Sequence, residues 1–325
     1  MTCRFVRLCL AAALWSLPIL PSHGADSPAS QTDAAFQQEL VKQQQIKTTT
    51  KRVGDQLEGV IAEFDRNGIS GEDVKILRAI RGVLDKLSEK DMAMVLEYLQ
   101  QSRAATDPSV AARNATDAFA GQKTIVVQLQ QLVLEYQRQQ ALYEISLRLK
   151  ELASRQSANM WLGVGLAKSI EGKTSFSSFD ENQRISLRYQ QSEQNPLKDE
   201  TAAILAKLAR LSTETIDGPA AERSKVALQQ AKDGGLAPAL EAAAEELKEE
   251  KLKLLSAIGN EKKGRDQLRE IARMLILSQD ATEALKQAIQ ELDRAIDAQK
   301  KVAAETQKTE KREPNRAMCP HAPTC

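Results

Sequence analysis

The segment from Gln122 to Arg155 constrains the fold more than any other part of the chain. It contains no glycine or proline, and its apolar residues recur at intervals close to 3.6, which predicts one amphipathic helix. At 34 residues and 1.5 Å per residue, this helix would be about 50 Å long. The apolar stripe is too wide to remain in water, so neighbouring helices are expected to cover it. It consists of Ile125, Val126, Leu129, Leu132, Val133, Tyr136, Leu142, Tyr143, Ile145, Leu147, Leu149 and Leu152.

The composition extends this expectation to the whole 325-residue chain. Ala, Leu, Gln, Glu and Lys dominate, and aromatic residues make up only 4%, a balance that favours helices over strands. We therefore predict an all-α fold, an elongated multi-helix bundle with long antiparallel, coiled-coil-like hairpins. The formal net charge is +1 and the chain has no basic block, so nucleic acid is not expected as a partner.

The first 24 residues have the features of an export signal. Arg4 and Arg7 precede an apolar segment from Leu8 to Leu20, and the small-residue sequence Ser22-His23-Gly24 follows. This pattern predicts a signal peptide, residues 1–24, on a protein that is periplasmic or secreted. An uncleaved N-terminal anchor is the alternative, although the apolar segment is short for a membrane span.

The remaining chain divides into four parts by the spacing of its apolar residues and helix breakers. Residues 25–32 form a linker that is predicted to be disordered, and residues 33–121 form a region of short helices. Residues 122–313 form a long-helix bundle with a tip loop at 156–180. Residues 314–325 form a tail that is predicted to be disordered.

Short motifs predict where the helices of the first half begin and end. Asn67-Gly68 should end the first helical region, and capping-box patterns at Ser70 and Ser88 should open two short helices. Asp107-Pro108 should open another helix, with the proline in its first turn. Gly121 should form a joint between that helix and the long one.

The second half shows further breaks and one very regular pattern. Breaks are expected at Asn195-Pro196, Gly218-Pro219 and Gly234-Gly235, with one helix from Leu236 to Ile258. Between Leu268 and Ile296, apolar positions alternate by three and four residues, as in a coiled-coil seam. Apolar residues also fill the g positions of this repeat, so packing inside a bundle is expected in place of a dimer zipper.

A helix, a glycine break and a returning alanine-rich helix are indicated within the segment from Gln183 to Ile258. The residues of this pattern are Val226, Gln230, Ala231, Gly234, Gly235, Ala237, Leu240, Ala243 and Leu247. In these residues the chain resembles the Gln/Ala/Leu-rich helical regions of large exported bacterial proteins of unknown function. Those relatives often carry Gln where Ala243 and Ala244 stand here. The resemblance covers about a quarter of the chain, and the family implies no catalytic residues.

Three motifs partly match the sequence patterns of known ligand sites. Residues 167–174 match a relaxed phosphate-binding loop, but a helix and not a buried strand precedes them. The sequence from Asp65 begins like a calcium loop, but Ile69 and Ile76 occupy positions that need carboxylates. In the tail, Cys319 and Cys325 are a candidate disulfide, with a plain unfolded tail as the alternative. Adding His321 would give three ligands in a flexible segment, which makes a poor metal site. No cofactor and no metal are therefore expected.

A candidate interaction patch lies where the helical pattern weakens. It comprises Met160, Trp161, Leu162, Val164, Leu166, Phe176 and Phe179. Gly163 and Gly165 are poor helix formers, so the long helix is expected to fray or bend here. Either these side chains close the end of the bundle by packing together, or they form an exposed patch that docks a partner protein or a membrane surface.

These features predict an exported structural or protein-interaction module of the cell envelope that acts through helical surfaces. A periplasmic chaperone-like clamp is the alternative in the same class, and an enzyme of unknown type is the alternative from another class. His321 is the only histidine outside the leader, and no nucleophile elbow is present, so catalysis is not expected. The expected partner is a protein, and a homo-oligomer remains an alternative.

Overall fold

The computed structural model describes residues 28–173, 175–213 and 218–312, and this part of the chain is all-α. Of the described residues, 90% are helical and none lies in a strand, which confirms the predicted fold class. In chain order the elements are α1 (Pro28–Arg66), α2 (Glu72–Lys86), the π-helical turn η1 (Leu87–Asp91), α3 (Met92–Ala104), α4 (Pro108–Ser169), the 3-10 turn η2 (Phe176–Ser178), α5 (Glu181–Thr213), α6 (Pro219–Asp233), α7 (Leu236–Glu246), α8 (Leu254–Leu275) and α9 (Gln279–Arg312).

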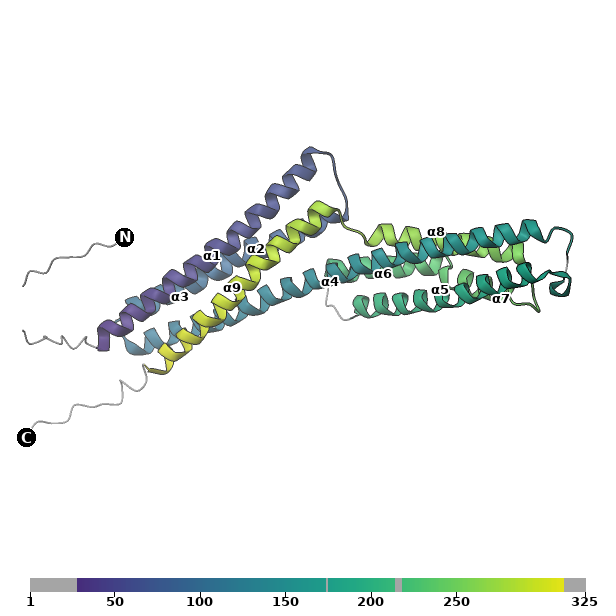
Figure 1. Cartoon of the computed structure of the whole chain (residues 1–325). Coiled ribbons are helices and arrows are strands. Elements are labelled where there is room, and N and C mark those ends of the chain that lie inside the picture. Colours follow the sequence, from purple (N-terminus) through teal and green to yellow (C-terminus); the bar gives the residue numbers. More distant parts are fainter. Residues whose placement is uncertain (1–27, 174, 214–217, 313–325) are drawn as a thin grey trace, which may run out of the picture.

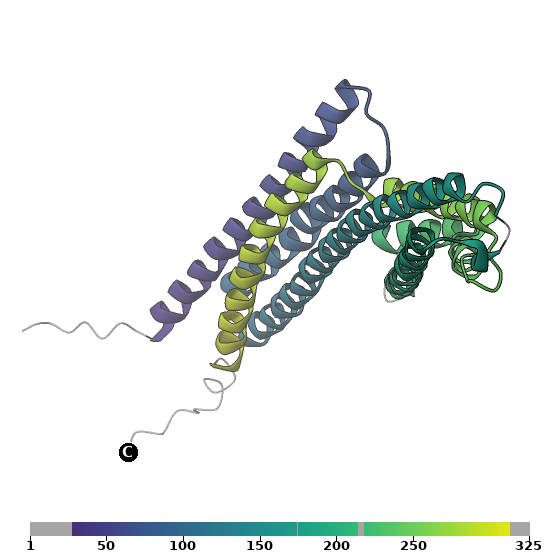
Figure 2. The same cartoon turned by 45° about the vertical axis from the view of Figure 1, so that its right-hand side comes forward.

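The molecule is an elongated pair of helical bundles that share one helix, α4 (Figure 1). The first half of α4 packs with α3 and α9, and α1 and α2 complete that bundle. The second half of α4 packs with α5, α6 and α8, and α7 lies against α5 and α8. The bundles are set at an angle to each other (Figure 2). The start of α1 and the end of α9 lie at one end of the molecule, and the connection from α4 to α5 lies at the other (Figure 1).

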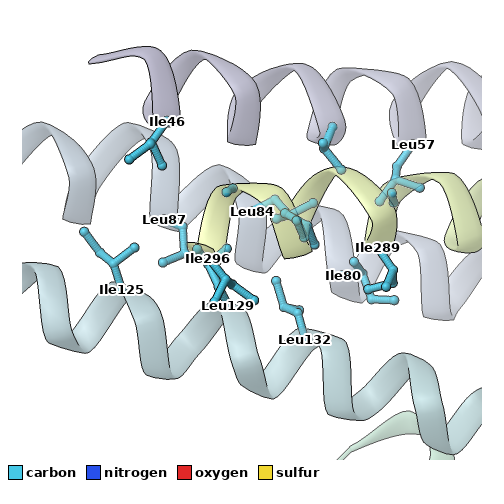
Figure 3. Close-up of a cluster of buried hydrophobic side chains, with 14 of the residues drawn as sticks. Ile46, Leu57, Ile80, Leu84, Leu87, Ile125, Leu129, Leu132, Ile289 and Ile296 are labelled. Atoms are coloured by element: carbon cyan, nitrogen blue, oxygen red, sulfur yellow. The ribbon is translucent and has the colours of Figure 1, made fainter. Parts of the chain in front are cut away.

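An apolar core holds the first bundle together, and side chains from sequence-distant helices meet in it (Figure 3). Leu57 of α1, Leu84 of α2 and Leu129 of α4 are at most 1% exposed. Ile289 and Ile296 bring α9 onto the same core, so the last helix of the chain packs beside the first. Each buried leucine or isoleucine contributes about 1.5–3 kcal/mol relative to exposure, which explains why this long-range pairing is stable.

The second bundle contains two further apolar clusters. The larger one joins α4, α5, α6 and α8 through residues such as Leu149, Leu208 and Leu268. The smaller one closes the far end, where Phe179 packs with Leu166 and neighbouring leucines from α5, the α7–α8 connection and α8. Polar side chains separate these two clusters, as described below.

The long helix is longer than the sequence pattern predicted. It begins at Pro108 and not at Gln122, and it remains helical to Ser169 over 62 residues. At 1.5 Å per residue it is about 90 Å long. The expected tip loop at 156–180 is therefore wrong over its first half, because the segment without α-helix starts only at residue 170.

Close packing explains the glycines that were expected to interrupt α4. A Cβ atom on Gly121 would lie 2.6 Å from Cγ2 of Val95, and one on Gly163 would lie 2.3 Å from Nε2 of Gln190. Both glycines therefore let a neighbouring helix approach α4, and neither breaks it. Gly165 faces open space within the same continuous helix. The predictions of a joint at Gly121 and of fraying at Gly163 and Gly165 are wrong.

Several other predicted boundaries are also wrong. Gly71 and not Ser70 is the N-cap of α2, and Ser88 lies buried inside η1 and does not open a helix. Helix α5 continues through Pro196, with the buried residues Gln194 and Leu197 on either side of it. Where burial on both sides holds a helix in place, a single unfavourable residue does not end it.

The heptad pattern from Leu268 to Ile296 spans two helices and not one. Helix α8 ends at Leu275, and α9 begins at Gln279. The α8 part of the pattern packs in the second bundle and the α9 part in the first. The expected helix from Leu236 to Ile258 is likewise divided, because α7 ends at Glu246 and α8 begins at Leu254.

Other local signals predicted boundaries correctly. Gly68 follows the end of α1 with a φ of 66°, and Gly235 separates α6 from α7 with a φ of 63°. Glycine adopts this left-handed conformation without steric cost. The carboxylate of Asp107 accepts a 2.8 Å hydrogen bond from the backbone N–H of Ser109 at the start of α4. Pro219 opens α6, as expected.

Some predictions fall on residues outside the described part of the chain. These are the signal peptide at 1–24 and the tail at 314–325 with its candidate disulfide, Cys319 and Cys325. Residues 28–32, which the sequence pattern assigned to the linker, form the start of α1. No helix in the described part of the chain combines the length and the apolarity that a bilayer crossing requires.

Candidate functional site

The candidate patch divides into a buried and an exposed half. Met160, Leu166 and Phe179 are buried, and Leu166 and Phe179 belong to the cluster that closes the tip. The rings of Phe176 and Phe179 pack at a centroid distance of 5.9 Å, and Phe176 is half-buried, like Val164. These side chains close the end of the bundle, which was one of the two alternatives for the patch.

The exposed half points into solvent. Trp161 is 64% exposed and Leu162 is 47% exposed. On the neighbouring helix α5, Ile185 and Tyr189 are 56% and 59% exposed. Neither of these two α5 residues belongs to the interaction patch predicted from the sequence. Their spacing of four residues, with the buried Leu187 between them, was the signal that they share an outward face. We call Trp161, Leu162, Ile185 and Tyr189 the distal face.

Helix geometry places Leu162, Ile185 and Tyr189 on one side of the α4–α5 pair. Helices α4 and α5 run antiparallel, and their contact is marked by the 2.8 Å ion pair between Arg155 and Glu193. Leu162 lies two turns beyond Arg155, and Tyr189 lies one turn before Glu193, so both are on that side of the helix pair. Trp161 points about 100° away from Leu162 around α4, and small exposed residues, among them 158 and 165, lie between the two. The distal face therefore curves around α4.

Ion pairs limit the distal face on the side toward the first bundle. Arg155 contacts Glu193 at 2.8 Å and Glu200 at 2.7 Å, and Arg148 also pairs with Glu200. The hydrogen bond from Arg155, with a further one from Arg148, lowers the pKa of the Glu200 carboxyl. An apolar area bordered by charged groups is the usual anatomy of a surface that binds a partner.

Charged side chains of both signs border the distal face toward the tip, where Glu181 lies exposed one turn before Ile185. The guanidinium groups of Arg184 and Arg188 lie 5.6 Å and 5.7 Å from the centre of the Phe176 ring, within cation–π distance. Arg188 also forms a 3.0 Å ion pair with Glu249. Lys168 lies exposed on the last turns of α4.

No protein-family model, curated protein sequence or solved structure matches this chain.

A layer of buried amide and carboxyl groups crosses the second bundle behind the distal face. Oε1 of Glu261 accepts hydrogen bonds from Asn159 Nδ2 at 3.0 Å and from Gln190 Nε2 at 3.1 Å. Nε2 of Gln156 donates to Oε1 of Gln194 at 2.8 Å. All five residues are at most 1% exposed. The layer connects α4, α5 and α8. The spacing of apolar residues does not predict it, because Gln and Asn are residue types that usually lie on the surface.

Glu261 is the most strongly perturbed group of this layer. Burial raises the pKa of its carboxyl to about 7, although the amides of Gln190 and Asn159 oppose that shift by hydrogen bonding to the charged form. Oδ1 of Asn159 and Oε1 of Gln190 have no hydrogen-bond partner among the described residues. A protonated Glu261 carries one O–H, which is a donor for only one of these two amide oxygens.

A second polar cluster lies where the two bundles meet. Oε1 of Glu135 accepts hydrogen bonds from the backbone N–H of Ala220 at 2.8 Å and from Gln139 Nε2 at 2.9 Å. The guanidinium group of Arg223 donates to Gln139 Oε1 at 2.5 Å, and burial lowers the pKa of Arg223. This cluster fixes the start of α6 against the middle of α4.

A groove lies in the first bundle, away from the Glu261 layer. It has a volume of about 670 Å³ and runs between α1 and α9. Lys42 and Arg52 on α1 pair across it with Glu305 and Glu291 on α9. Glu261 lies in the other bundle, so the groove and the shifted carboxyl do not form one site. Among the described residues, no three His, Cys, Asp or Glu side chains are arranged to hold a metal ion.

Proposed function

We propose that the chain is an exported structural and interaction module of the cell envelope that presents the distal face far from the start of α1 and the end of α9. The observation that carries this proposal is the exposure of Trp161, Leu162, Ile185 and Tyr189 near the end of α4 and the start of α5. The connection between these helices lies at the end of the molecule opposite to the start of α1 and the end of α9 (Figure 1). The 53 helical steps from Pro108 to Trp161 correspond to about 80 Å along α4.

The construction of the molecule supports a role as a spacer. One continuous helix passes through both bundles, and apolar cores pack against it along most of its length. The Glu135 cluster fastens α6 to the middle of α4, and the Glu261 layer fastens α5 and α8 near its end. A helix that is fastened at these points keeps its two ends at a fixed separation.

The chemistry of the distal face supports a role in binding. Grouped apolar residues on a protein surface usually mark an interaction site, and Trp and Tyr are the residues that most often dominate binding energy. An enzyme is less well supported, because a catalytic site needs a cleft that converges on a perturbed titratable group. The groove between α1 and α9 and the buried Glu261 carboxyl lie in different bundles.

Site-specific photo-crosslinking in envelope fractions tests the proposal. A photoreactive amino acid replaces Leu162 on the distal face or, as a control, Leu134 in the middle of α4. Both leucines are 47% exposed on the same helix, so exposure alone cannot explain a difference. We expect a discrete crosslinked product from position 162 and none from position 134. Identical products from both positions, or none from either, would overturn the proposal.

A further inference from the structure

At one level of the second bundle, hydrogen bonds between side chains take the place of apolar contacts. Within residues 188–196 of α5, the buried side chains are Gln190 and Gln194. Within residues 258–263 of α8, the buried side chain is Glu261. Two amide side chains of α4 complete this Glu261 layer. Helices α5 and α8 pack mainly on α4 and α7, so the hydrogen bond from Gln190 to Glu261 joins them across the core.

Beyond the layer, toward the connection from α4 to α5, the second bundle rests on the smaller of its two apolar clusters. That cluster consists of the buried residues Leu166, Phe179, Leu187, Leu247, Leu254 and Ala257, with half-buried neighbours. The larger cluster lies on the other side of the layer and joins α4, α5, α6 and α8. The layer therefore continues the packing of α5 and α8 on α4 from one cluster to the other.

An ionised Glu261 fits the layer poorly. Its Oε1 accepts hydrogen bonds from Asn159 at 3.0 Å and from Gln190 at 3.1 Å, and its Oε2 accepts one from Gln190 at 3.3 Å. The amide oxygens of Asn159 and Gln190 have no donor among the described residues. The O–H of a protonated Glu261 is a donor for one of them. Ionisation removes this donor and leaves a carboxylate charge in the core, where water does not solvate it.

The charged groups on the helices around Glu261 do not offset that charge. Several of them pair with one another: Arg155 with Glu193, Arg188 with Glu249, Lys198 with Glu241, Glu245 with Lys248 and Lys251, and Arg265 with Asp266. Glu246 of α7 accepts a 2.8 Å hydrogen bond from Asn260, and Lys262 and Lys263 of α8 are exposed. Helix α6 packs on α8 farther from this end of the bundle. Among the described residues, no cation lies within ion-pair distance of Glu261.

We propose that the Glu261 layer is a pH-sensitive latch for the end of the second bundle that carries the α4–α5 connection. When Glu261 is protonated, the layer holds α5 and α8 on α4. When Glu261 ionises, these helices separate at this level and water reaches the carboxylate. Burial raises the pKa of Glu261 to about 7, so the latch responds to pH near neutrality. It acts whether or not the distal face binds a partner, and it is therefore independent of the proposed function.

Hydrogen exchange measured by mass spectrometry on the full-length protein tests the latch. The pKa of Glu261 is about 7 in the closed state, and it returns to the ordinary value of 4.5 when the layer opens. Opening should therefore become about tenfold more favourable between about pH 6 and about pH 8. After correction for intrinsic exchange rates, peptides from residues 183–194 of α5 should lose protection by about tenfold. Peptides from residues 46–57 of α1, in the first bundle, should stay more protected and change less.

Two variants of α8 make the test specific. Glu261→Gln keeps a neutral side chain of nearly the same shape, so the protection of residues 183–194 should no longer depend on pH. Glu270→Gln removes a carboxylate from a side chain that is 42% exposed on the same helix, and the pH dependence should remain. Circular dichroism verifies that each variant is folded. Unchanged α5 protection between the two pH values, an equal change in the α1 peptides, or a pH dependence that persists in Glu261→Gln would overturn the latch.

Discussion

Replacing Glu261 by Gln should make the protein more stable at about pH 8 and leave its stability nearly unchanged at about pH 4. Glu261 is fully buried in the layer between α4, α5 and α8, and burial raises its pKa from 4.5 to about 7. A carboxyl whose pKa is higher in the folded state binds its proton more tightly there. Its contribution to stability is complete below the unfolded pKa and is lost as the pH rises through the folded pKa.

The expected difference in unfolding free energy follows from the size of the pKa shift of Glu261. Each pKa unit corresponds to 1.36 kcal/mol, so the difference between 4.5 and about 7 corresponds to about 3 kcal/mol. Gln is neutral at every pH and has nearly the same shape as protonated Glu. It can accept from Asn159 Nδ2 and donate toward Oε1 of Gln190, which has no partner in the native layer. The variant therefore avoids the cost of a buried charge without opening a cavity.

Urea unfolding followed by circular dichroism at several pH values measures this effect. The unfolding free energy of the variant should exceed that of the wild type by about 3 kcal/mol at about pH 8, and the two should converge near about pH 4. Glu270→Gln, which removes an exposed carboxylate from the same helix, should change stability by less than about 0.5 kcal/mol. Parallel wild-type and Glu261→Gln curves across this pH range would refute the argument that burial controls this carboxyl.

Three further predictions concern the packing of Ile289, the close approach at Gly163 and the buried hydrogen bonds of Glu135. Ile289→Ala should lower the unfolding free energy by about 2–4 kcal/mol in urea unfolding, because this buried residue joins α9 to the first core; a loss below about 0.5 kcal/mol would contradict its burial. Gly163→Ala should lower the melting temperature, since its Cβ would lie 2.3 Å from Nε2 of Gln190. Gly165→Ala, at a position that faces open space, should raise stability by about 1 kcal/mol. Equal effects of Gly163→Ala and Gly165→Ala would show that Gly163 is not in close contact with Gln190. Glu135→Ala should cost about 2–4 kcal/mol, because it leaves buried donors without an acceptor; a neutral calorimetric result would show that water replaces the carboxylate.

The sequence alone determined the fold class and those helix ends that depend on local chemistry. Helix-forming composition and a period near 3.6 require helices with an apolar side, whatever covers that side. Gly68 and Gly235 occupy left-handed backbone positions, and Asp107 accepts a hydrogen bond from the backbone N–H of Ser109. Each of these signals acts within a few residues, so each can be recognised without knowledge of the rest of the structure.

The spacing of apolar residues indicated which side of each helix is buried, but the tertiary structure decided which other helix covers that side. The heptad pattern continues across the break after Leu275, yet its two parts lie in different cores. Gly121 and Gly163 looked like breaks, although they are contact points for other helices. Their role depends on Val95 and Gln190, which are distant in sequence, so no local pattern could show it.

The candidate site illustrates the same division. The sequence identified the segment around Trp161 as unusual, but it could not separate the buried Met160 from the exposed Trp161 beside it. Adjacent residues on a helix point about 100° apart, so burial depends on where α5 and α8 lie. Ile185 and Tyr189 joined the distal face only because α5 packs antiparallel to α4. Local chemistry determined the helices, and long-range packing decided which of their side chains meet solvent and which meet each other.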